Sequence, residues 1–230
     1  MIFKVVVRKF VNCMGVMTLN TDSIESNLDM FLAMIPFVVI LFIMFLLFKP
    51  LHHRNYKTLI TGAESVRWGR FFIAALIWGG LAGIYLLCNY VIDPTNFAFH
   101  FNADSFLVLS ILSLALIPFQ ASYEEVVFRG YFAQGVGAWP KSRWLVILIP
   151  SILFGLMHSF DPDVSKYGFW VMMPQYILFG LMFGLVTVLD DGIELAMGAH
   201  AANNIFISIV ITAKGSSFQP SSLFTQQITN

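Results

Sequence analysis

The chain has 230 residues, of which 58% are hydrophobic and 11% are charged, and its mean hydropathy is +0.77. Soluble domains carry about 25% charged residues, so this composition excludes an ordinary soluble domain and predicts a polytopic integral membrane protein. Thirteen basic and thirteen acidic residues give a formal net charge of zero, which indicates no nucleic-acid partner. Cys13 and Cys88 lack a CxxC spacing, so they indicate neither a disulfide framework nor a thiolate metal site.

The order of apolar and polar stretches predicts the organisation of the chain. Residues 1–29 are predicted to form an N-terminal lead-in, either interfacial or disordered, and residues 213–230 a polar tail, also predicted to be disordered. Between them, residues 30–212 are predicted to form a transmembrane bundle. Its six apolar runs are long enough to cross a bilayer; they cover residues 30–48, 71–92, 105–120, 144–157, 169–189 and 193–212.

A helix from about Ala121 to Ala133 is expected after the third run, as a seventh span if it is separate. The predicted fold is therefore an all-α, polytopic integral membrane helical bundle of about six to eight transmembrane helices with a buried polar active site. Two Gly-xxx-Gly pairs predict close helix packing in this bundle, one at Gly79 and Gly83 and one at Gly180 and Gly184.

The loop at residues 49–70 is the most basic part of the chain, with five Lys and Arg residues against a single acid, Glu64. By the positive-inside rule this loop is predicted to be cytoplasmic. Three basic residues before residue 10 favour the opposite orientation. The loop lies closer to its flanking spans, so its charges are given more weight.

Two adjacent carboxylates and an arginine follow the third apolar run, at Glu124, Glu125 and Arg129. Ionisable groups at membrane depth are costly, so their clustering indicates a function. Glu125 and Arg129 are four residues apart and can form an ion pair on one helix face. Glu124 lies about 100° around the helix and is left as a free carboxylate, which suits a general base for water activation.

Polar residues on two later apolar runs could face this cluster. His158 ends the fourth run, and His200 and Asn204 share one face of the last. A histidine and an amide can supply a proton donor, a metal ligand and a hydrogen bond to an oxyanion. Taken singly, these residues are typical of a helix cap or of hydrogen bonds between helices. Together, on a charge-poor bundle, they favour a catalytic site.

An ordered set of three motifs resembles those of the CPBP intramembrane protease family, the Abi group that includes the type II CAAX prenyl endopeptidases. The motifs are Glu124-Glu125-xxx-Arg129, Phe154-xxx-His158 and His200-xxx-Asn204. The similarity spans a protease core at about residues 105–210. It implies peptide-bond hydrolysis by an activated water, at a site below the membrane surface.

The resemblance also implies roles for single residues. Glu124 would be the general base, His158 would position the water, and His200 and Asn204 would stabilise the oxyanion, while the Glu-Arg pair holds the shape and charge of the site. Family members include metalloproteases and metal-independent glutamate proteases, so the cofactor is either none or a divalent metal such as zinc. Glu124, His158 and His200 are possible ligands, although a His-Glu-xx-His helix is absent from the sequence.

The expected function is that of an intramembrane endopeptidase acting on membrane-associated peptides or lipidated proteins. It is expected to be a multi-pass protein, in the cell membrane if the source is bacterial. One alternative is a non-enzymatic protein of the same fold with a bacteriocin-immunity or scaffold role. Another is a transporter that uses the intramembrane Glu/Arg/His cluster. A simple up-and-down arrangement sets His158 and His200 at different depths, which predicts a broken, tilted or re-entrant segment.

Overall fold

The structure is a computed structural model that describes residues 27–138, 142–213 and 222–227. The N-terminal lead-in predicted for residues 1–29 lies outside the described residues up to residue 26. From Asn27 onward the chain is already helical.

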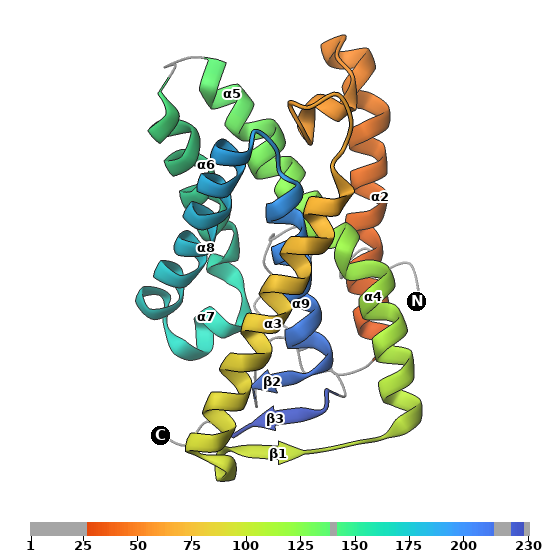
Figure 1. Ribbon diagram of the computed structural model, residues 1–230, viewed down its shortest axis with the longest axis vertical. Helices are drawn as coiled ribbons and strands as arrows, with labels where there is room; N and C mark the ends of the chain where they lie inside the picture. Colours follow the sequence, from red (N-terminus) through yellow and green to blue (C-terminus); the bar gives the residue numbers. More distant parts are fainter. Residues whose placement is uncertain (1–26, 139–141, 214–221, 228–230) are drawn as a thin grey trace.

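Each of the six predicted apolar runs forms a helix, although the last run ends in strand β2, which covers Ile211–Ala213 (Figure 1). In chain order the helices are α2 (Asn27–His52), α3 (Trp68–Ile92), α4 (Ala103–Glu125), α6 (Arg143–Met157), α8 (Phe169–Asp190) and α9 (Glu194–Ile209). Among the described residues, four helices are long and apolar enough to cross a membrane, namely α2, α3, the helix that starts with α4, and α8. The chain is thus a helical integral membrane bundle, as predicted.

The helix predicted from about residue 121 to residue 133 is not a separate element. Helix α4 continues through a π-helical segment, η3 (Val126–Phe132), into α5 (Ala133–Ala138), giving one span of 36 residues. The polar residues of this region do not break the helix because they find partners inside the bundle. A π-helical turn within an α-helix is frequent at functional sites.

A small sheet closes one end of the bundle, here called the sheet end (Figure 1). Strand β3 (Phe224–Gln226) lies between β1 (Phe97–Phe99), to which it is antiparallel, and β2 (Ile211–Ala213), to which it is parallel. The expectation of a disordered tail is therefore wrong for the described part of it. Short helical segments complete the fold: η1 (Tyr56–Leu59), η2 (Pro94–Asn96), η4 (His158–Phe160) and α7 (Pro162–Tyr167).

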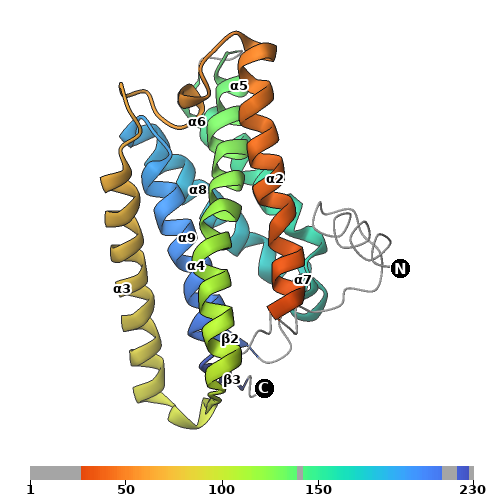
Figure 2. The same cartoon turned by 90° about the vertical axis from the view of Figure 1, so that its right-hand side faces the viewer.

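Helix α9 lies inside the bundle, packed against α3 and α4 (Figure 2). A Cβ atom at Gly198 of α9 would collide with the carbonyl oxygen of Phe71, so this glycine permits the close approach of α3. The predicted approach at Gly79 and Gly83 is wrong, because a Cβ atom at either would meet nothing within 4 Å. The bundle uses the other side of α3 for packing.

The second glycine pair does support close packing, between α8 and α6. A Cβ atom at Gly180 would lie 2.9 Å from the Cα of Ser151, and one at Gly184 would lie 3.2 Å from a methyl carbon of Ile147. These contacts bring α6 against α8 along a stripe of small residues, as expected for helices in membranes.

The basic loop between α2 and α3 is fastened to the turn between α8 and α9 at the other end of the bundle, here called the basic end. The Gly62 amide donates to the carbonyl oxygen of Asp191 at 2.9 Å, and the Ile193 amide donates to that of Ile60 at 2.8 Å. The Arg67 guanidinium also reaches Glu194, the first residue of α9, with an Nη2–Oε2 distance of 2.8 Å. These bonds fix the start of α9 and hence the depth of its side chains.

Candidate active site

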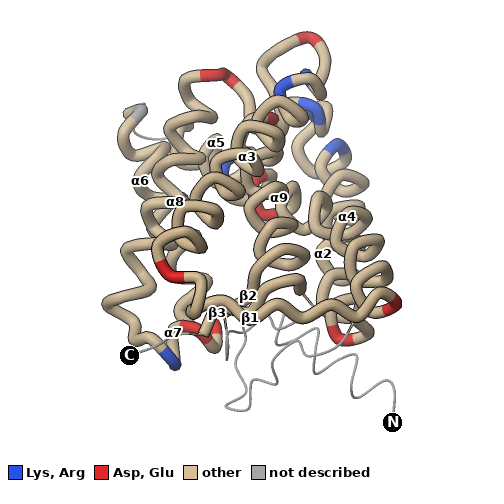
Figure 3. The backbone as a smooth tube through the Cα atoms, turned by 60° about the horizontal axis from the view of Figure 1, so that its bottom comes forward, with Lys and Arg blue, Asp and Glu red and all other residues tan. Residues whose placement is uncertain are grey.

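Most charged residues of the described chain lie at the ends of the bundle, and a small group of both signs lies within it (Figure 3). The buried members of this inner group come from α4, η3 and α9. Glu125 is 0% exposed, Arg129 3%, His200 6% and Glu124 8%. Charges buried to this degree require partners, so the contacts of each group define what the site can do.

Arg129 is held from three sides. Its Nη1 donates to Glu125 Oε1 at 3.0 Å, which is the ion pair expected from the four-residue spacing. Its Nη2 donates to the carbonyl oxygen of Gly180 on α8 at 3.2 Å. The ring of Phe154 lies 4.5 Å from the guanidinium carbon, close enough for a cation–π contact. Arg129 therefore ties α8 and α6 to the glutamate pair.

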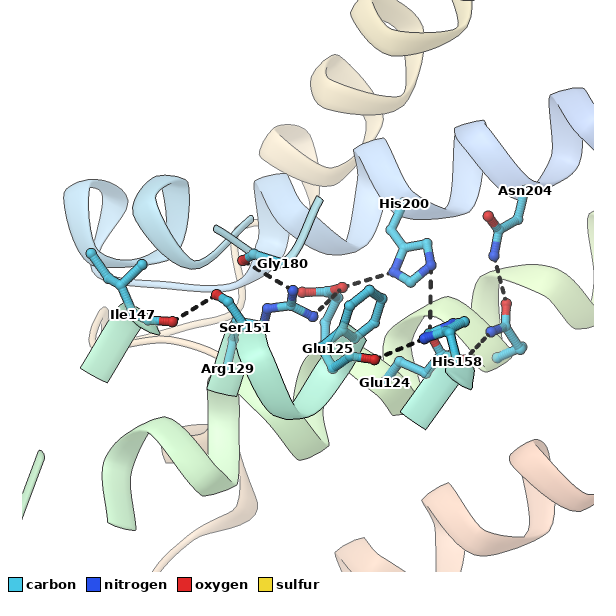
Figure 4. A network of polar contacts seen from close by, with 11 residues as sticks. Glu124, Glu125, Arg129, Ile147, Ser151, His158, Gly180, His200 and Asn204 are labelled. Atoms are coloured by element: carbon cyan, nitrogen blue, oxygen red, sulfur yellow. Dashed lines mark hydrogen bonds and ion pairs between the residues drawn. The ribbon is translucent and has the colours of Figure 1, made fainter. Parts of the chain in front are cut away.

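His200 lies between the two glutamates (Figure 4). Its Nδ1 is 2.7 Å from Glu125 Oε1, and its Nε2 is 3.6 Å from Glu124 Oε2. The ring stacks on Phe183, with centroids 5.4 Å apart and planes inclined by 20°. With the Nδ1 hydrogen donated to Glu125, the imidazole is oriented so that Nε2 faces Glu124.

Glu124 is positioned by a residue that the sequence interpretation missed, Gln120. Gln120 Nε2 donates to Glu124 Oε1 at 2.5 Å, and Asn204 Nδ2 donates to Gln120 Oε1 at 3.0 Å. Asn204 is thus linked to Glu124 through one intermediate side chain. A signal was available, because Gln120 is a polar residue at the end of an apolar run and four residues before Glu124.

The second carboxylate oxygen of Glu124, Oε2, differs from Oε1 in its hydrogen bonding. Glu124 Oε2 is buried and accepts no hydrogen bond from the described residues. Its nearest polar neighbour in the network is His200 Nε2, which is too distant for a direct hydrogen bond. The site therefore presents an unused carboxylate oxygen beside an imidazole nitrogen.

His158 follows the last turn of α6, and its side chain turns back along that helix. Its Nδ1 is 2.8 Å from the carbonyl oxygen of Phe154, so Nδ1–H donates there and Nε2 remains for other partners. The ring stacks on Tyr176 of α8 at 4.5 Å between centroids and 21° between planes. Tyr176 is a second residue that the sequence interpretation missed.

The two histidines approach the same region without a re-entrant segment. The ring of Phe154 lies 4.7 Å from that of His158 and 6.0 Å from that of His200, between centroids. Both imidazoles thus lie near the ring of Phe154, although a simple up-and-down arrangement places the two histidines at different depths. The His158 side chain points toward the start of α6, as helical side chains do.

Asp161 lies just beyond the apolar segment that carries His158, at the N-cap of α7. Burial raises the pKa of Asp161 to about 6, while the charge of His158 lowers it and the charge of Glu124 raises it further. The Tyr176 hydroxyl forms a hydrogen bond with this carboxyl. Asp161 is thus close enough to both His158 and Glu124 for their charges to affect its pKa.

Glu124, His158 and His200 were considered above as possible zinc ligands. In the part of the chain that the structure describes, no group of three His, Cys, Asp or Glu side chains has an arrangement that could hold a metal ion. The Nδ1 atoms of both histidines are bonded to protein oxygens. These bonds leave both Nε2 atoms free, and a metal-bound histidine commonly donates its other ring N–H to a protein oxygen in this way.

Comparison with known proteins identifies related sequences. Residues 102–206 match the family described as "Type II CAAX prenyl endopeptidase Rce1-like". The "Uncharacterized protein YyaK" of Bacillus subtilis (strain 168) is 34% identical over 164 residues, which are 71% of this chain and 54% of that protein. The chain thus spans about half the length of this relative. No solved structure matches the chain.

Proposed function

Through residues 102–206 the chain belongs to the Rce1-like family of type II CAAX prenyl endopeptidases, and from this premise we propose that it is an intramembrane endopeptidase. The reaction is hydrolysis of a peptide bond by a water molecule that Glu124 activates. The substrates are peptides or protein segments presented at or within the bilayer, with lipidated proteins among them. The site of action is the cell membrane.

One observation carries this proposal, namely the unused oxygen of Glu124. A buried carboxylate oxygen without a hydrogen-bond donor costs free energy, so a water or a ligand group that donates to it would be favourable. Every other contact of the network holds Glu124 and His200 in place around that oxygen. A water beside Glu124 Oε2 and His200 Nε2 would satisfy both atoms.

The proposed chemistry follows from these positions. The water oxygen attacks the carbonyl carbon of the scissile bond while Glu124 takes a proton from that water. The protonated Glu124 then gives this proton to the leaving nitrogen as the carbon–nitrogen bond breaks. A positioned acid–base group of this kind typically contributes about 10²- to 10⁴-fold to the rate.

In the proposed reaction His200 acts as an imidazolium. Arg129 and a His200 imidazolium carry two positive charges, and Glu124 and Glu125 carry two negative charges, so the buried group is neutral. The imidazolium then presents Nε2–H toward the reacting centre, where it stabilises the developing oxyanion. Glu125 holds the ring through Nδ1 and fixes this orientation.

Asn204 and His158 have supporting roles in the proposal. Asn204 has two amide hydrogens, and the one not donated to Gln120 reaches the oxyanion. His158 orients the water through Nε2, because its Nδ1–H is already donated to Phe154. The stacking of His158 on Tyr176 limits rotation of the ring and so keeps Nε2 in one direction.

The test is cleavage of lipidated and unlipidated peptides by the chain reconstituted in membranes. Wild type is compared with Glu124→Ala and His200→Ala, and with Glu64→Ala as a control that removes an exposed carboxylate outside the site. We expect cleavage by wild type and by the control, and none by the two site variants while both remain folded. Cleavage by both site variants at the wild-type rate would show that the catalytic assignment is wrong.

Each reaction is also run with a strong zinc chelator. Loss of cleavage with recovery on added zinc would mean that a metal activates the water. Unchanged cleavage would support direct activation by Glu124.

A further inference from the structure

A large cavity of the described chain is not lined by the proposed catalytic residues. It has a volume of about 740 Å³, within the usual range for small-molecule sites. It lies at the basic end and is lined by residues of α5, α6, α8 and the segment from Arg54 to Gly62. Glu124, His158 and His200 are not among its lining residues, whereas Arg129 is. Arg129 therefore separates this cavity from the glutamate pair.

Two side chains that line the cavity have buried polar atoms without partners among the described residues. Arg129 is 3% exposed and its Nε has no hydrogen-bond acceptor, although both Nη atoms are engaged. The Thr187 hydroxyl oxygen is also buried and unpartnered. Figure 4 shows Ser151, another lining residue, beside Arg129 on the side away from Glu125. Two residues that line this cavity thus each have a donor without a partner among the described residues.

The charge of the cavity is positive. The charge of Arg129 is balanced by Glu125, and the rest of the lining has two cationic side chains, Arg54 and Lys57, against one acid, Asp191. Lys57 is held to the carbonyl oxygens of Ala63 and Glu64, so its charge is fixed at the rim. Positive potential at the mouth of a cleft raises the local concentration of anions.

From these observations we propose that the cavity binds an oxyanion group, a carboxylate or a phosphate, that accepts hydrogen bonds from Arg129 Nε–H and the Thr187 hydroxyl. Arginine N–H groups and hydroxyls are the usual donors to such anions, and charge-assisted hydrogen bonds are about twice as strong as neutral ones. The site is distinct from the proposed catalytic site, and its occupancy does not depend on proteolysis. Arg129 connects the two, because an anion at Nε competes with Glu125 for the same positive charge.

The test uses the full chain purified in detergent micelles, with inorganic phosphate and acetate as probes and chloride as the reference at equal ionic strength. Ligands that bind the folded state raise the unfolding temperature in a saturable way, whereas the general stabilising effect of phosphate does not saturate. We expect a saturable rise for wild type with at least one probe. Thr187→Val is expected to weaken the apparent affinity about tenfold, since it removes a hydrogen bond to a charged group.

Two further variants keep the test decisive. Thr225→Val makes the same change on β3 at the sheet end and should bind like wild type. Arg54→Gln, on the exposed rim, should weaken binding about twofold and still tests the site if Thr187→Val fails to fold. If neither probe gives a saturable rise, or if Thr187→Val binds as tightly as wild type, the cavity holds only water and the proposal is wrong.

A second arm identifies the source of the anion. The chain is placed in nanodiscs of phosphatidylcholine with or without phosphatidylglycerol. If a lipid headgroup occupies the cavity, phosphatidylglycerol will raise the unfolding temperature of wild type more than that of Thr187→Val. If the occupant is a soluble anion, the two lipid compositions will give the same difference between the variants.

Discussion

Two buried carboxylate clusters lie against helix α9, and their hydrogen bonding differs. Glu194, at the start of α9, is 0% exposed, and both its oxygens are bonded. Oε1 accepts from the Arg67 amide and from Arg67 Nε, each at 3.0 Å, and Oε2 accepts from Arg67 Nη2. In the cluster around His200, the Oε2 atoms of Glu124 and Glu125 accept nothing from the described residues.

This difference in hydrogen bonding distinguishes a structural ion pair from a site with unused hydrogen-bond acceptors. Arg67 satisfies Glu194 completely, and this hydrogen bonding raises the pKa of Arg67 above its ordinary value. A satisfied pair of this kind holds the α2–α3 loop on the bundle and has no atom left for a ligand. The inner cluster keeps buried acceptors unused, which costs stability and indicates a function.

The comparison predicts opposite outcomes when a charged group is replaced in each of the two clusters, and the largest effect is expected at Glu124. Glu124→Gln keeps the size of the side chain but removes the base, so turnover should fall about 10²- to 10⁴-fold. The free energy of unfolding should be unchanged or higher, because a neutral amide costs less to bury than a carboxylate. Peptide cleavage and denaturant unfolding in mixed micelles measure the two quantities. A variant that unfolds easily but cleaves normally would reverse the interpretation.

At the structural ion pair, stability should change and turnover should not. Arg67→Met removes the guanidinium that pairs with the buried Glu194, so the free energy of unfolding should fall by about 3–5 kcal/mol. Cleavage per folded molecule should stay at the wild-type level.

Arg70→Met provides the matched control for this change. Arg70 also pairs with Asp190, but its side chain is 45% exposed, so the loss should be below about 1 kcal/mol. Equal losses for the two variants would show that burial of Glu194 does not decide the strength of the structural ion pair.

The helical fold could be predicted from the sequence because few backbone structures can cross a membrane. Apolar runs of sufficient length must be helices, since each backbone polar group has to be bonded within the segment. The same reasoning predicted a helix from about residue 121 to residue 133 but left open whether it continues α4, because polar side chains after residue 120 suggest an end to the span. It also missed β3 in the tail, because strand pairing between residues 97–99 and 224–226 leaves no local signal.

The candidate site divides in the same way between local and distant contacts. The Glu125–Arg129 pair follows from helix geometry and is present. The bond from Arg67 to Glu194 joins residues 127 apart and could not be predicted from spacing. The sequence places polar residues on faces of single helices, but helix packing decides which faces meet.

The smallest effect is expected for the chain of amides that leads from Asn204 through Gln120 to Glu124. Gln120→Met removes both hydrogen bonds at once, whereas Asn204→Ala removes one. If Asn204 acts partly through Gln120, the two changes will not be additive, and the double variant will lose less turnover than the product of the single losses. A coupling free energy of about 1 kcal/mol is expected for residues in one network.

A second double-mutant cycle, Ser208→Ala with Gln120→Met, is the control for the first. Ser208 also lies on α9 and bonds a residue of α4, Ser113, at 2.7 Å, but it has no bond to the amide chain. Its effect on turnover should therefore add to that of Gln120→Met. Additivity in both pairs would mean that Asn204 acts on the oxyanion alone. Coupling confined to the Asn204 pair would make Gln120 a positioning residue for Glu124, because a merely structural role would lower stability without linking the two changes in turnover.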